Sequence, residues 1–118
     1  MTTNEFLQKY RKLWDIGVPV NVTRPRVKCA DGFTVSVQAG WGICSTPAKD
    51  ADEYTAVELG FPSEDDDLIK DYHDTGVYPQ VPVELVDMLF KKHGGIVGAD
   101  FSNTSGSWEA MNGGAEDV

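Results

Sequence analysis

The strongest constraint on the fold of this 118-residue chain is the alternation of apolar and polar residues along 26–39. The alternation breaks at Ala30-Asp31-Gly32, a combination that is typical of a turn between two antiparallel strands. A two-residue turn would put the apolar side chains of the first strand on the face opposite to those of the second strand. A three-residue loop with Gly32 in the left-handed conformation instead pairs Cys29 with Phe33. This register puts the apolar side chains of both strands on one face. We therefore predict a hairpin with that register.

Two further segments have the apolar periodicity of amphipathic helices. The first helix is predicted over residues 3–15 and begins with a capping box formed by Thr2 and Glu5. The second helix is predicted over residues 82–93, where the basic last residues and His93 suit the negative C-terminal end of the helix dipole. A strand is predicted over 54–61 with Phe61 on its apolar face, followed by an acidic turn or short helix over 62–72 and an edge strand over 77–81.

This order of elements predicts an α+β fold, a small antiparallel β-sheet of three to four strands flanked by an N-terminal and a C-terminal helix. The chain is long enough for one hydrophobic core, and no apolar run approaches the roughly 18 residues of a membrane span. We predict a single domain over residues 1–97. Residues 98–118 lose the apolar periodicity and predict a flexible tail, in which Trp108 and Met111 are the exceptions.

Charge is distributed unevenly along the chain, whose formal net charge is −9. Residues 1–28 carry six basic and two acidic groups, whereas residues 50–74 carry ten acidic groups and a single lysine. One interpretation is a solvated segment that keeps the protein soluble, and the other is a surface for a basic partner. For the second interpretation the candidate partner-binding residues are Asp50, Asp52, Glu53, Glu64, Asp65, Asp66, Asp67, Asp71 and Asp74.

The sequence contains no motif that predicts catalysis or metal binding. Cys29, Cys44, His73 and His93 are the soft ligands, and none of them has the spacing of a zinc site. The Asp50-x-Asp52 pair begins like a calcium-binding loop, but the residues that follow do not supply the glycine and glutamate that such a loop requires. The three aspartates at 65–67 could attract Mg²⁺, but acidic residues are equally common at the N-terminus of a helix. We therefore expect no catalytic residues, no metal, no cofactor and no enzymatic activity.

Four segments resemble blocks in small, mostly uncharacterised proteins of phages and prophages, many of them from gut bacteria. These segments are residues 27–39, 54–63, 81–86 and 92–96. The resemblance carries no catalytic or binding residues, and it implies an accessory phage protein in the bacterial host cytoplasm. By analogy with other small acidic phage proteins, it suggests an anti-CRISPR-like inhibitor of host defence.

Three functions stay open from the sequence. The preferred one is a non-enzymatic inhibitor whose acidic segment binds a basic, nucleic-acid-binding surface of a host defence protein, with no direct contact to nucleic acid or membrane. The second is a sponge for a nucleotide immune signal, for which Arg24, Arg26, Trp14 and Trp41 would supply the basic and aromatic groups. The third is a structural or dimerisation module, in which the partner is a second copy of the chain.

Overall fold

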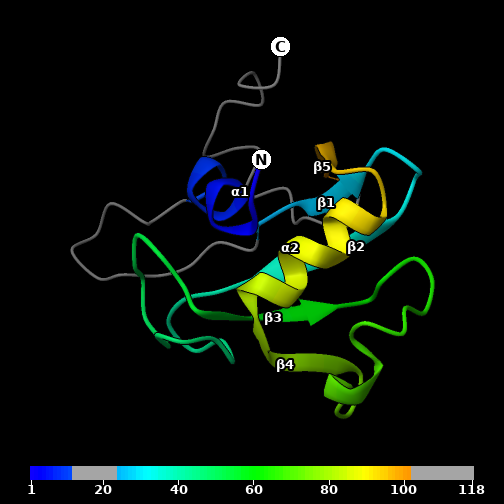
Figure 1. Ribbon diagram of the computed structural model, residues 1–118. Coiled ribbons are helices and arrows are strands. Elements are labelled where there is room, and N and C mark those ends of the chain that lie inside the picture. The colour runs from blue at the N-terminus through cyan, green and yellow to red at the C-terminus, as the bar shows by residue number, and fades with distance from the viewer. Residues whose placement is uncertain (12–23, 102–118) are drawn as a thin grey trace.

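The structure is a computed structural model that describes residues 1–11 and 24–101 (Figure 1). The elements in chain order are α1 (Thr3–Lys9), β1 (Arg26–Cys29), β2 (Thr34–Gln38), β3 (Ala56–Gly60), the 3-10 helix η1 (Lys70–Tyr72), β4 (Val77–Pro82), α2 (Val83–Lys92) and β5 (Ile96–Asp100). The α+β class is confirmed, with five strands in place of the expected three to four.

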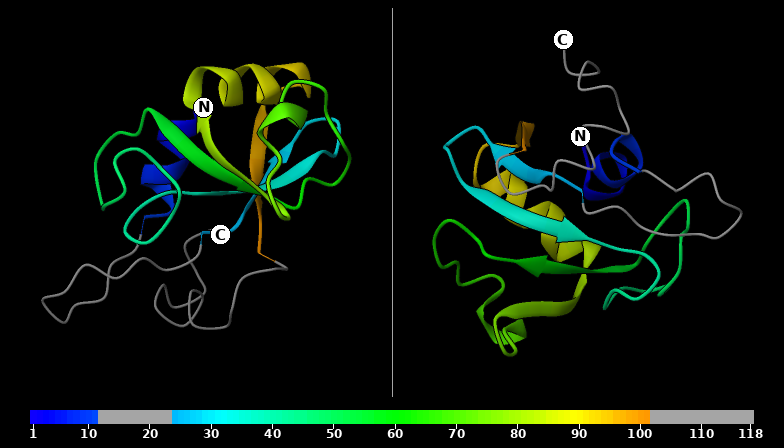
Figure 2. Two further views of the ribbon diagram at one scale, coloured as in Figure 1. Left: turned by 90° about the horizontal axis from the view of Figure 1, so that it is seen from below. Right: turned by 180° about the vertical axis from the view of Figure 1, so that it is seen from behind.

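The strands form one sheet in the order β4-β3-β2-β1-β5, in which every neighbouring pair is antiparallel. Helix α2 lies across one face of the sheet and packs against α1 (Figure 2). Along β2, Val35 and Val37 are fully buried in the core beneath the helices, whereas Thr34, Ser36 and Gln38 alternate with them and are half-buried. This period of two gives the sheet a single apolar face.

The predicted hairpin register is confirmed. Val27 pairs with Val35, and Gly32 in the loop has a φ of +96°. The loop also contacts the end of α2, because the N–H of Asp31 donates to the carbonyl oxygen of His93 at 3.1 Å. The hairpin turn therefore lies beside the C-terminus of α2.

Strand β5 crosses the position at which the domain was expected to end. It pairs with β1 through Val27 and Ala99, and it extends across residue 97, where the tail was expected to begin. Its sequence offers few large apolar residues, so its strand conformation depends on the backbone of β1 beside it more than on its own periodicity. Residues 102–118, with Trp108 and Met111, lie outside the described residues.

Two elements are shorter than predicted. The capping box of α1 is confirmed, but the helix ends at Lys9, and residues 12–15 of the predicted helix lie outside the described part of the chain. Strand β3 ends at Gly60, because Phe61 has a φ of +49° that turns the chain out of the strand. The side chain of Phe61 is consequently 70% exposed and does not join the apolar face.

Candidate functional site

The nine predicted partner-binding residues belong to two segments of the chain, one before β3 and one after it, and these segments lie at opposite ends of that strand (Figure 1). Asp50, Asp52 and Glu53 precede the strand, where Arg11 forms ion pairs with both Asp50 and Asp52. The other six lie in residues 61–76 between β3 and β4, which we call the acidic loop. The acidic segment is therefore divided between two surfaces.

The acidic loop presents most of its carboxylates to solvent, while one of its apolar side chains packs into the core. The exposed carboxylates belong to Glu64, Asp65, Asp67, Asp71 and Asp74. Nζ of Lys70 lies 3.8 Å from Oδ1 of Asp67, and both side chains are largely exposed. This ion pair therefore contributes little to the stability of the protein. Ile69 is fully buried in the hydrophobic core. A concavity of about 360 Å³ in this region is lined by Asp65, Asp66, Asp67, Lys70, His73 and Tyr78.

Asp66 differs from its neighbours, because its side chain is only 2% exposed. Its Oδ1 accepts hydrogen bonds from the N–H of Leu68 at 2.9 Å and from Nζ of Lys92 at 3.0 Å, and its Oδ2 lies 2.8 Å from Nε2 of His93. With three donors on its two oxygens and almost none of its side chain exposed, this carboxylate is not available to a basic partner at the surface. Asp66 is thus an internal anchor of the acidic loop, and its expected place on the binding surface is wrong.

His93 connects three segments that are far apart in the sequence. It is the C-cap of α2, and its Nδ1 lies 2.6 Å from Oδ2 of Asp31 in the hairpin turn. Its Nε2 faces Asp66 in the acidic loop, and its ring stacks on Phe33 with centroids 4.0 Å apart. An ionised carboxylate only accepts hydrogen bonds, so two of them facing the two ring nitrogens favour the charged imidazole, in which both nitrogens donate. The expected role of His93 as a helix-terminal charge accounts for only part of these contacts.

The pKa values of this cluster follow from its hydrogen bonds. Burial alone would lower the pKa of His93, but the bonds to Asp31 and Asp66 outweigh it and raise the pKa above its ordinary value. Burial likewise would raise the pKa of Asp66, but the donors Leu68, His93 and Lys92 hold it below the usual range. The pKa of Asp31 is lowered by the N–H of Phe33 first and by His93 second. The imidazolium and each of the two carboxylates therefore stabilise each other in their charged forms.

A third carboxylate lies close to the same imidazole. Oε1 of Glu64 is 4.0 Å from Nδ1 of His93, and Asp31, Glu64 and His93 each offer one ligand atom within 4.8 Å of the others. This cluster has no local signature in the sequence, because its residues are about thirty positions apart and no short motif contains two of them. The paired signals that could have pointed to it are the Asp-Gly turn and the histidine that directly ends a helix.

Two other groups singled out from the sequence serve the interior. Cys29 is buried in the core, and its burial, followed by the nearby charge of Asp31, raises the pKa of its thiol to about 11, which makes it a poor nucleophile near neutral pH. Arg24 is also buried, and its Nε and Nη1 donate to the carbonyl oxygens of Leu7 and Ala39 at 3.0 and 2.7 Å. Arg26 donates to Oγ1 of Thr34 at 3.0 Å. These arginines stabilise the fold, and their buried guanidinium groups are not presented to an anionic ligand.

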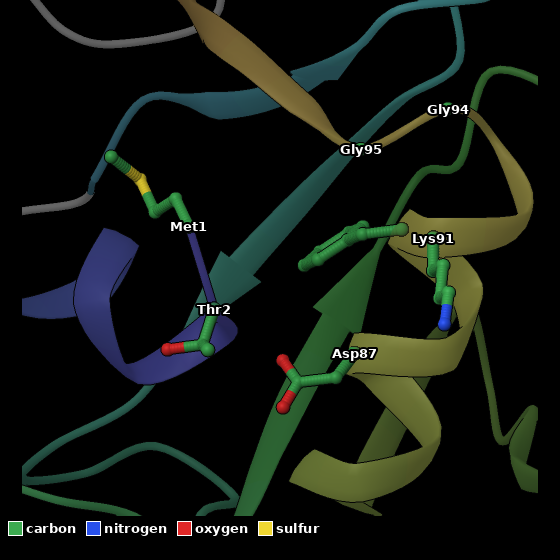
Figure 3. Close-up of a pocket in the computed structure, with 7 residues that line it drawn as sticks. Met1, Thr2, Asp87, Lys91, Gly94 and Gly95 are labelled. Carbon is green, nitrogen blue, oxygen red and sulfur yellow. The ribbon is translucent and has the colours of Figure 1, made fainter.

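A second hollow, of about 420 Å³, lies between the N-terminus and the last turns of α2 (Figure 3). Met1 and Thr2 border it on one side, and Asp87, Lys91 and the Gly94-Gly95 link border it on the other. Oδ1 of Asp87 accepts hydrogen bonds from both the N–H and the hydroxyl of Thr3, so it serves to attach α1 to α2. The carboxylate that lines this hollow is therefore already in structural use.

Comparison with known proteins gives no relative for this arrangement: no family model, no curated protein and no solved structure matches the chain. None of the helices in the described part of the chain combines the length and apolar character that crossing a membrane requires.

Proposed function

We propose that the protein is a phage-encoded, non-enzymatic inhibitor that acts in the bacterial host cytoplasm. It binds a basic, nucleic-acid-binding surface of a host defence protein, in the manner of an anti-CRISPR protein. The observation that supports this most directly is the acidic loop, which exposes five carboxylates beside one lysine. Such a surface repels itself, and a basic partner relieves this repulsion.

The anchoring of the acidic loop supports the proposal further. Ile69 in the core and Asp66 against His93 tie the loop to the sheet and to α2. A loop that is already ordered loses less conformational entropy on binding than a free acidic tail does. The exposed carboxylates are therefore presented as a pre-formed surface.

The experiment compares two double charge reversals with the same change in net charge. Asp65→Lys with Asp67→Lys alters the acidic loop. Glu53→Lys with Glu84→Lys alters one exposed candidate residue on the other side of β3 and one exposed acid of α2, so it tests whether the effect belongs to the acidic loop. Asp66 is left unchanged because its replacement would release the anchor. The wild-type protein is used to capture its partner from host lysate, and association rates are then measured for each variant at several salt concentrations.

We expect the acidic-loop variant to associate at least about tenfold more slowly, because exposed charges mainly steer encounter. The control variant should lose much less, and DNA or RNA should compete with the wild-type protein for the same partner. Equal losses in the two variants, or binding that is insensitive to salt and to nucleic acid, contradict the proposal.

A further inference from the structure

The cluster around His93 has the composition of a metal site in addition to its structural role. Asp31 comes from the hairpin turn, Glu64 from the start of the acidic loop, and His93 from the end of α2. One imidazole nitrogen and two carboxylate oxygens are donors that zinc and neighbouring first-row ions accept. No segment of the chain contains more than one of these ligands, so only the fold brings them together.

The orientation of the imidazole supports this interpretation independently of the ligand count. Metal-bound histidines commonly donate their second ring N–H to a carboxylate, which holds the ring and makes the first nitrogen a better ligand. Here Nε2 of His93 faces Oδ2 of the buried Asp66 at 2.8 Å, and Phe33 stacks on the ring. The opposite nitrogen, Nδ1, is thereby directed at Asp31 and Glu64.

The distances require only small side-chain movements. Two ligand atoms on one tetrahedral zinc ion are about 3.3 Å apart. Nδ1 of His93 lies 2.6 Å from Asp31 and 4.0 Å from Glu64, so one carboxylate must withdraw slightly and the other must approach. Both side chains are about half-exposed or more and have room to adjust.

We propose that Nδ1 of His93 and the carboxylates of Asp31 and Glu64 bind a divalent first-row metal ion, for which Zn²⁺ is the probe. The ion takes the place of the proton on Nδ1, which passes to solvent, while Nε2 keeps its proton toward Asp66. The remaining coordination position is open to water. Binding fastens the start of the acidic loop to the hairpin turn, and it does not depend on the proposed function.

The test uses a protein with the competing ligands removed. Cys44 is exposed and His73 is exposed, so both are replaced, as Cys44→Ser and His73→Gln. The remaining histidine is then His93, because the chain has two. Zn²⁺ is titrated into this protein by calorimetry, and the ring nitrogens of His93 are followed by NMR.

Two neighbouring carboxylates provide the matched comparison. Glu64→Gln removes a ligand, and Asp65→Asn removes the same charge from an exposed side chain that is not a ligand. We expect one Zn²⁺ per chain, a shift of the Nδ1 resonance, at least about tenfold weaker binding for Glu64→Gln and less than about twofold for Asp65→Asn. The absence of stoichiometric binding, an unshifted Nδ1 resonance, or equal weakening by the two substitutions would overturn the proposal.

Discussion

Replacement of Asp66 by asparagine tests whether the His93 cluster holds the acidic loop. The amide oxygen can still accept from Leu68, but the amide NH₂ cannot accept the proton on Nε2 of His93. Hydrogen bonds to charged groups contribute about 1.5–3 kcal/mol each, and Lys92 adds little because it is half-exposed. We therefore expect Asp66→Asn to lower the free energy of unfolding by about 2–3 kcal/mol near pH 5.5.

The pH dependence of this loss has a defined sign. A histidine whose pKa is raised by folding adds stability that is complete below its unfolded pKa, about 6.5, and disappears as the pH rises through the folded value. The lowered pKa of Asp66 adds stability that is present above about pH 4 and disappears as the pH falls. The two groups are thus both charged near pH 5.5. The loss caused by Asp66→Asn should be smaller at pH 9 than at pH 5.5, because His93 loses its charge as the pH rises through its folded pKa.

Urea unfolding followed by far-UV circular dichroism measures these values at both pH values. Asp67→Asn is the matched control, because Asp67 is the next residue and its side chain is 92% exposed. The control should change the free energy of unfolding by less than about 0.5 kcal/mol. Equal effects of the two substitutions, or a loss for Asp66→Asn that does not shrink at high pH, would refute the reasoning.

Three further predictions concern the scaffold of the site. A thiol reagent should modify Cys44 rapidly and Cys29 only after unfolding, because Cys29 is buried and its pKa is raised to about 11. Mass spectrometry of the labelled protein shows which cysteine has reacted. In urea unfolding, Gly94→Ala should destabilise the protein more than Gly76→Ala does. Both glycines have a φ near +90°, but only at Gly94 would the new Cβ meet another atom, the Cβ of Ala30 in the hairpin loop at 2.8 Å. A chain that ends after Val97 loses the last three residues of β5, so it should melt about 5 °C or more below a chain that keeps the whole strand, and equal melting temperatures would contradict this.

Local patterns in the sequence determined the elements whose side chains carry a strong periodicity. The hairpin register follows from the requirement that all apolar side chains of the two strands share one face, and the structure confirms it. Helix α2 matches its prediction to one residue at each end, because its apolar stripe and its glycine stop are both local. Strand β5 has no such pattern, and its pairing with β1 decided its conformation.

The site was decided by the tertiary structure. In the sequence Asp66 is the middle of three identical residues, and nothing local distinguishes it from Asp65 and Asp67. The fold places the end of α2 beneath the acidic loop, so Asp66 turns inward to His93 while its neighbours stay exposed. A charged side chain becomes an anchor when an element distant in sequence supplies the opposite charge in a buried position. Spacing along the chain does not encode which distant residues the fold brings together.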